Sequence, residues 1–153
     1  MVTIGKKVAE FTVPATGDKT LSLSDFEDKN LVIYFYPKDS TPGCTLEGQN
    51  FRDLYPEFQA TNTGILGVSR DSLKRHENFK CKQEFPFDLL SDEDEALCNQ
   101  FDVIHEKNMY GRKVLGIVRS TFLIDGKGVL RAEWRKVRVK GHVDEVLDAV
   151  KQL

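Results

Sequence analysis

The chain has 153 residues, of which 40% are hydrophobic and 30% are charged. This length fits a single domain spanning residues 1–153, and the composition excludes disordered and fibrous proteins. The 22 basic and 24 acidic side chains give a formal net charge of −2, whereas proteins that bind nucleic acid or anionic membrane surfaces normally carry a basic excess. We therefore expect neither nucleic acid nor a membrane as a partner.

The N-terminal segment Met1–Lys7 has no apolar stretch behind its charges, so it does not have the pattern of a secretory signal peptide. No apolar run approaches the roughly 20 residues that are needed to cross a bilayer. These two features predict a cytoplasmic protein.

Short hydrophobic runs predict the strands. A hairpin is predicted near the N-terminus, at residues 11–20. Three β-branched and aromatic runs predict strands that are buried on both faces, at residues 31–36, 65–69 and 121–124. The last of these turns through residues 125–128 into a further strand at residues 129–134.

Apolar residues at helical spacing predict helices over residues 44–59 and 71–84, and a C-terminal helix that includes residues 143–150. Pro56 is expected to kink the first helix or to mark its last turn. The acidic run at residues 91–95 is predicted to cap a further helix and to form its first turn. The sequence therefore predicts an α/β fold with a mixed central β-sheet flanked by helices and with an N-terminal β-hairpin extension.

Three cysteines are present, Cys44, Cys81 and Cys98. None belongs to a Cys-x-x-Cys pair, so the sequence predicts neither a dithiol redox motif nor a zinc knuckle. Cysteine chemistry in this chain would be that of a single nucleophile.

Several other polar features have ordinary interpretations. The three histidines are scattered and form no ligand cluster, so surface or capping roles are predicted for His76, His105 and His142. Residues 108–113 are predicted to be a loop, and residues 134–140 a solvated basic strand and loop. No metal site is expected.

The strongest chemical signal is the segment Pro37–Glu47, which follows a predicted buried strand and opens a predicted helix. Cys44 then lies on a first helical turn, where free backbone N–H groups and the helix dipole favour the nucleophilic thiolate. Gly43 brings bare backbone close to the sulfur, and Thr41 can place a hydroxyl beside it. On these grounds alone, an inert buried cysteine at a helix start remains the alternative.

The pattern Pro37-x-x-x-Thr41-x-x-Cys44 resembles the active-site signature of peroxiredoxins. Residues 34–47 as a whole are similar to the peroxiredoxin Q, or bacterioferritin comigratory protein, branch of that family. Further similar segments lie at residues 67–72, 90–92 and 119–128. The resemblance covers nearly the whole chain. It implies a thioredoxin-like fold and a peroxidase that reduces hydrogen peroxide and organic hydroperoxides without a metal or organic cofactor.

The resemblance also implies roles for single residues. Cys44 would be the peroxidatic cysteine, which attacks the peroxide O–O bond and becomes a sulfenic acid. Thr41 would hydrogen-bond the peroxide and the sulfur, and Arg119 would be the active-site arginine. A guanidinium beside the sulfur favours the thiolate and can bind the peroxide oxygens. By its position alone, Arg119 would instead be a surface charge on a strand.

The remaining implied site residues surround the cysteine. Pro37 and Pro42 would shield it, and Gly43 belongs to the predicted substrate-binding set. Glu47 would fix Arg119 or receive a proton, and a simple helix-start carboxylate is the equal alternative.

The resolving cysteine is a further prediction from the resemblance. Many members of the branch carry it five residues after the peroxidatic cysteine, but Gln49 occupies that position here. Another form of the branch places it on the next helix, where Cys81 lies one residue beyond the matching position. Cys81 is predicted to face solvent and to form an intramolecular disulfide with Cys44. A disulfide needs Cα atoms within about 7 Å, so the turn around Cys44 would have to unwind.

The third cysteine, the reductant and the oligomeric state can also be predicted. Cys98 shares a helical face with Phe101 and is predicted to be a buried structural cysteine. Thioredoxin or a similar thiol protein would reduce the disulfide, and the protein is predicted to be a monomer. The alternatives are a one-cysteine peroxidase served by an external thiol, a redox sensor without turnover, and a dithiol oxidoreductase, against which the lack of Cys-x-x-Cys argues.

Overall fold

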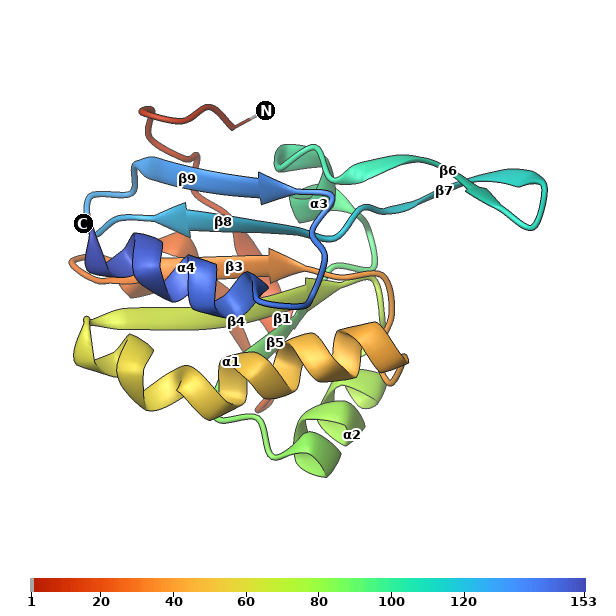
Figure 1. The fold of residues 1–153 in the computed structure, drawn as a ribbon, viewed down its shortest axis with the longest axis horizontal. Coiled ribbons are helices and arrows are strands. Elements are labelled where there is room, and N and C mark those ends of the chain that lie inside the picture. The colour runs from red at the N-terminus through yellow and green to blue at the C-terminus, as the bar shows by residue number, and fades with distance from the viewer. Residues whose placement is uncertain (1) are drawn as a thin grey trace.

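The computed structural model describes residues 2–153, so Met1 lies outside the described residues. Within this range a mixed sheet of seven strands forms the centre, in the order β2-β1-β5-β4-β3-β8-β9. Its strands are β1 (Thr12–Ala15), β2 (Lys19–Ser22), β3 (Asn30–Phe35), β4 (Thr63–Ser69), β5 (Asp88–Ser91), β8 (Ser120–Ile124) and β9 (Leu130–Arg135). β3, β4 and β5 run parallel, whereas β8 and β1 join this group antiparallel (Figure 1).

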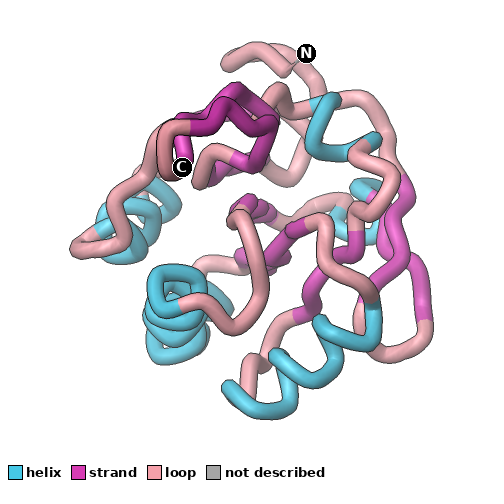
Figure 2. The backbone as a smooth tube through the Cα atoms, turned by 90° about the vertical axis from the view of Figure 1, so that its right-hand side faces the viewer, coloured by secondary structure: helices cyan, strands magenta, loops and turns pink. Residues whose placement is uncertain are grey.

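Helices cover both faces of the sheet. The helices α1 (Pro42–Ala60), α2 (Leu73–Gln83) and α4 (His142–Lys151) share one hydrophobic core with one face, and they lie on the same side of the strands in Figures 1 and 2. The short α3 (Ala96–Gln100) and N-terminal residues such as Phe11 pack on the other face. A 3-10 turn, Leu23–Phe26, connects β2 to β3.

The side chains of strand β3 are buried on both faces of the sheet. Leu31, Ile33 and Phe35 contribute to the core under α3, whereas Val32 and Tyr34 contribute to the core under α1 and α4. Successive side chains of a strand point to opposite faces, so an uninterrupted apolar run fits only a strand that is covered on both faces.

Most of the predicted elements are confirmed. The N-terminal hairpin is β1–β2, and the runs at residues 31–36, 65–69 and 121–134 form β3, β4 and the β8–β9 hairpin. The predicted helices correspond to α1, α2 and α4, and Pro56 lies inside α1, which continues to Ala60. The α/β class with a mixed sheet is therefore correct.

The prediction of a loop at residues 108–113 is wrong. Residues 108–113 are not a loop, because they form the tip of a hairpin of β6 (Ile104–Met109) and β7 (Arg112–Ile117) that projects from the body of the molecule (Figure 1). Most of its side chains are exposed, so the hairpin lacks the apolar alternation that marks a half-buried strand. Strand β5 was also not predicted.

The acidic run at residues 91–95 does not form a first helical turn, since Ser91 ends β5 and α3 begins only at Ala96. Asp92 nevertheless caps the start of α3 with its side chain, although it lies before the helix in the sequence. Its carboxylate accepts hydrogen bonds from the backbone N–H groups of Leu97 at 3.0 Å and Cys98 at 2.7 Å. The negative charge is therefore near the helix start, as the dipole favours.

Gly48 marks the close approach of α1 to the segment after α2. A methyl group at this position would overlap the Phe85 ring, 2.8 Å from its Cε1 atom. Although alanine inside a helix is normally more stable than glycine, Gly48→Ala is expected to lower the free energy of unfolding by about 1–3 kcal/mol because of overpacking. Urea denaturation measures this change. The double variant Gly48→Ala/Phe85→Leu should recover part of the loss, and a stabilised single variant would contradict this close packing.

Candidate active site

Cys44 lies at the start of α1 because of the residues that precede it. Thr41 is the N-cap residue with extended backbone (φ −85°, ψ 154°), and Pro42 occupies the first helical position, where a missing N–H costs no hydrogen bond. The first helical bond runs from the Thr45 N–H to the Thr41 carbonyl over 2.9 Å. Cys44 is thus the third residue of the helix, and only 2% of it is exposed.

Arg119 provides the main polar contact of the sulfur. It lies between β7 and β8, 75 residues from Cys44 in the sequence, and its Nη2 donates to Cys44 Sγ over 3.3 Å. Its Nη1 donates to Glu47 Oε1 over 2.7 Å. The guanidinium therefore joins the cysteine to the carboxylate one helical turn further along α1.

Gly43 makes room for this arginine. A β carbon at position 43 would lie 3.1 Å from Arg119 Nη2, which is a tight contact with a group that two hydrogen bonds hold in place. Glycine at this position therefore allows the guanidinium to approach the helix start.

Burial and neighbouring charges together shift the pKa values of Glu47 and Arg119. Burial raises the pKa of the fully buried Glu47 to about 7, although Arg119 acts in the opposite direction. Burial alone would lower the pKa of Arg119, but the negative charges of Glu47 and Cys44 outweigh it and raise that pKa. Among the described residues, Glu47 Oε2 and the Tyr34 hydroxyl are buried without a hydrogen-bond partner.

Lys107 on β6 is a second cation in this region that sequence reasoning missed. It is half-buried, with its stem packed 3.5 Å from the position of a Gly116 β carbon. Burial and the positive charge of Arg119 lower its pKa, and the charge of Cys44 opposes this shift. The projecting hairpin thus brings a positive charge toward the cysteine.

Thr41 has a different partner from the predicted one. Its hydroxyl donates to the Lys38 carbonyl over 2.8 Å, so its hydrogen is directed into the loop and not at the sulfur. Its oxygen lone pairs remain able to accept a hydrogen bond. Pro37 is half-buried and lies two residues after the end of β3.

The other two cysteines lie as predicted. Cys81 is exposed near the end of α2, whereas Cys98 is fully buried, and all three thiols are free. Burial, helped by the nearby Asp92, raises the pKa of Cys98 far above its usual value, which suits an inert packing residue. Gln49, where a local resolving cysteine would lie, donates to the Gln83 side chain over 2.9 Å and thereby joins α1 to α2.

Two histidines do not have the predicted surface roles. His76 is 0% and His142 is 4% exposed, and each makes a buried hydrogen bond. His105 is exposed. The sequence does contain a signal for the burial of His76, because this residue lies three positions before Phe79 and therefore on the same face of α2, and both are buried.

Most of the chain matches a known protein family and several named relatives. Residues 4–133 match the AhpC/TSA family. The chain is 59% identical over 145 residues to Peroxiredoxin Bcp of Xanthomonas campestris pv. campestris, covering 90% of this chain and 91% of the relative. It is 45% identical over 152 residues to Peroxiredoxin Bcp of Bacillus subtilis, covering 99% and 97%.

Solved structures show the same similarity. Peroxiredoxin Q of Xanthomonas campestris matches with a TM-score of 0.89 at 56% identity, over 93% of this chain and 90% of that chain. A cysteine-to-serine variant of Xylella fastidiosa PrxQ matches with a TM-score of 0.94 at 46% identity, over 99% and 97%.

A thioredoxin-like fold with a cysteine on a first helical turn beside an arginine defines a thiol-dependent peroxidase. The chain belongs to the AhpC/TSA family and, within it, to the peroxiredoxin Q, or Bcp, branch. Within residues 2–153, no helix combines the length and apolar character needed to cross a membrane. The same residues contain no group of three or more His, Cys, Asp or Glu side chains arranged to hold a metal ion.

The raised pKa of Glu47 predicts a pH-dependent contribution to stability. Because the folded state holds this proton more tightly, the contribution is complete below the ordinary pKa of 4.5 and is lost as the pH rises through about 7. The difference in free energy of unfolding between the wild type and Glu47→Gln is expected to fall by up to about 3 kcal/mol as the pH rises over this range. Urea denaturation of both proteins at several pH values measures it, and a difference that stays level or rises would contradict the assignment.

Proposed function

We propose that Cys44 is the peroxidatic cysteine and that Arg119 and Thr41 bind the peroxide beside it. The guanidinium that bridges Cys44 Sγ and Glu47 supports this most strongly. In the reaction the sulfur donates an electron pair to one peroxide oxygen, the O–O bond breaks, and the other oxygen leaves as hydroxide or alkoxide. Cys44 becomes a sulfenic acid. The fixed donors of Arg119 stabilise the charge on the departing oxygen.

The other residues of the site position the substrate. The hydroxyl hydrogen of Thr41 is directed at the Lys38 carbonyl. The Thr41 oxygen therefore holds the peroxide by accepting a hydrogen bond from the O–H group of the peroxide. Gly43 leaves space for Arg119 and offers bare backbone, and Pro37 shields one side of the site. Glu47 fixes Arg119 through the 2.7 Å ion pair.

Replacement of the arginine tests the chemical step. Arg119→Lys is expected to lower the second-order rate constant for Cys44 oxidation by about 100- to 1,000-fold, because one ammonium cannot reproduce the fork that reaches both partners. Stopped-flow measurement of a single turnover with hydrogen peroxide gives this constant. Arg131→Lys, on the exposed part of β9, is the matched control and should react like wild type. A rate within twofold of wild type for Arg119→Lys would remove Arg119 from the chemical step.

We propose further that Cys81 resolves the sulfenic acid. Its thiol displaces the hydroxyl group of the Cys44 sulfenic acid, so that a disulfide forms and water leaves. The exposed position of Cys81 on α2 supports this, because a reductant can reach a disulfide there. Cys44 is buried at the other helix, so the first turn of α1 must unwind before the sulfurs meet.

Peptide mapping after one equivalent of hydrogen peroxide, without added thiol, tests the resolver. The wild type is expected to lose two hydrogens and to yield a Cys44–Cys81 cross-linked peptide. Cys81→Ser should instead retain an added oxygen on Cys44, and Cys98→Ser, the matched control, should still form the cross-link. An oxygen on Cys44 of the wild type, with Cys81 free, would leave a one-cysteine peroxidase that uses an external thiol.

The partners follow from this cycle. We propose hydroperoxides as substrates, thioredoxin or a similar thiol protein as reductant, and a monomer as the working form, in line with the branch that the chain resembles. Three thiols without a paired framework fit a reducing compartment such as the cytoplasm.

A further inference from the structure

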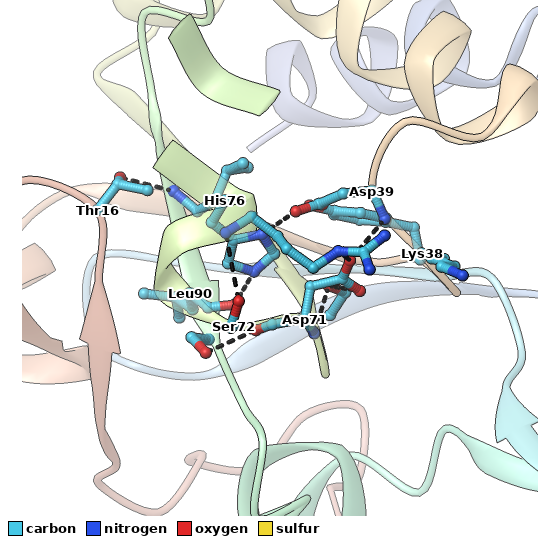
Figure 3. A network of polar contacts seen from close by, with 12 residues as sticks. Thr16, Lys38, Asp39, Asp71, Ser72, His76 and Leu90 are labelled. Atoms are coloured by element: carbon cyan, nitrogen blue, oxygen red, sulfur yellow. Dashed lines mark hydrogen bonds and ion pairs between the residues drawn. The ribbon is translucent and has the colours of Figure 1, made fainter. Parts of the chain in front are cut away.

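A buried polar network lies directly beside the loop that precedes Cys44 (Figure 3). His76 Nδ1 and Asp39 Oδ2 are 2.6 Å apart, and these side chains are only 0% and 1% exposed. The Tyr36 hydroxyl donates to Asp39 Oδ1 over 2.6 Å. His76 Nε2 contacts the Leu90 carbonyl over 2.8 Å. None of these side-chain contacts has a part in the chemistry proposed above.

The hydrogens of this network can be assigned from the acceptors. A carbonyl oxygen only accepts, so His76 Nε2 carries a hydrogen and donates it to Leu90. The other ring nitrogen and Asp39 Oδ2 therefore share one hydrogen between them. With Tyr36 on the second carboxylate oxygen, every polar atom of the pair has a partner, and a buried network that is fully satisfied holds its members rigidly.

The network joins three separate parts of the chain. Asp39 belongs to the loop between β3 and α1, His76 lies on α2, and Leu90 lies on β5. The Asp39 N–H also donates to Asp71 Oδ2 over 3.2 Å, and Asp71 is paired with Arg75 of α2. The loop before Cys44 is thus fastened to the first half of α2.

The loop itself has an unfavourable backbone conformation. Ser40, between Asp39 and Thr41, has a φ of +63°, in the left-handed region that residues with a β carbon rarely occupy. Such a conformation persists only where the surrounding contacts hold it. Release of Asp39 therefore favours rearrangement of the residues that lead to Cys44.

A second attachment lies on the other side of Cys44. Gln49 and Arg52 of α1 donate to the side chain and carbonyl of Gln83, each over 2.9 Å. Between these contacts and Asp39, no hydrogen bond joins the described residues 40–48, which carry Cys44, to α2. Cys81 lies on the same helix as His76, so α2 carries both the fastening of the loop and the proposed partner of Cys44.

We propose that Asp39 and His76 are positioning residues: their buried contact holds the loop before Cys44 closed while the peroxide reacts, and its rupture releases Cys44 for disulfide formation. The first part is independent of the resolving cysteine, whereas the second rests on the proposed role of Cys81. The closed state favours reaction with peroxide because it keeps Thr41 and Arg119 aligned with the sulfur. The open state favours the disulfide.

His76→Phe tests the proposal, because phenylalanine fills the space but makes no hydrogen bond to Asp39. Hydrogen exchange of the backbone amides of residues 38–46 in the reduced protein is expected to rise about 10-fold or more. Oxidation of Cys44 by peroxide should become about 10-fold slower. The step from sulfenic acid to disulfide should become faster, so that less Cys44 sulfinic acid forms with excess peroxide.

Two conservative variants separate positioning from general destabilisation. Asp39→Asn can keep both side-chain bonds, by donating to a neutral His76 and accepting from Tyr36, so its exchange should stay within about threefold of wild type. Tyr36→Phe removes one hydroxyl only and should give an intermediate effect if His76→Phe fails to fold. Unchanged exchange and rates in both Tyr36→Phe and His76→Phe would overturn the proposal.

Lys80→Met is the matched control on the same helix. It breaks the 2.7 Å ion pair that holds α2 to Asp88 but does not touch the loop. Exchange at residues 38–46 should stay at the wild-type level, and an increase equal to that of His76→Phe would overturn the proposal. The same exchange measurement is repeated in a Cys81→Ser background. It tests the role of Asp39 and His76 in the closed state whether or not Cys81 is the resolver.

Discussion

The half-buried guanidinium of Arg119 bridges two groups that each need a positive charge, the sulfur of Cys44 and the carboxylate of Glu47. Glu47 is fully buried, and a buried carboxylate without a partner is strongly unfavourable. Cys44 lies where the helix dipole favours a thiolate. The same side chain therefore makes the carboxylate tolerable in the core and places its Nη2 donor beside the sulfur of Cys44.

The sheet brings these groups together. β3 and β8 are antiparallel neighbours, and Phe35 at the end of β3 pairs with Ser120 at the start of β8. The loop to Cys44 leaves the sheet where Arg119 arrives, so both lie at the same edge. Asp39 and His76 extend this arrangement into α2 (Figure 3). The environment of the cysteine is therefore built from three segments far apart in the sequence.

The two halves of the proposed catalytic cycle make opposite demands on this region. Peroxide reduction needs donors held in fixed positions, whereas disulfide formation needs Cys44 to leave a site where it is only 2% exposed. A loop held by a few buried polar contacts, with a left-handed Ser40, can meet both demands, because it is rigid when closed and gains backbone freedom when open. Local stability at such a site is a compromise and not a maximum.

Local patterns in the sequence were enough for much of the fold. Runs such as residues 31–36 predict two-sided strands because strand periodicity places neighbours on opposite faces. The hairpin of β6 and β7 escaped prediction because its exposed strands carry no apolar alternation. A surface or capping role is predicted for His76 because sequence alone does not show a hydrogen-bond partner 37 residues away.

For the site, local sequence is enough to place Cys44 on the first turn of a helix, through Pro42 and Gly43, and to show the motifs that mark the family. The contact of Arg119 with the sulfur, the hydrogen bond from Thr41 to Lys38 and the attachment of Asp39 to α2 become visible only in the folded chain. The physical reason is that helix starts and strand periodicity depend on neighbouring residues. Hydrogen bonds between distant segments depend on how the elements pack.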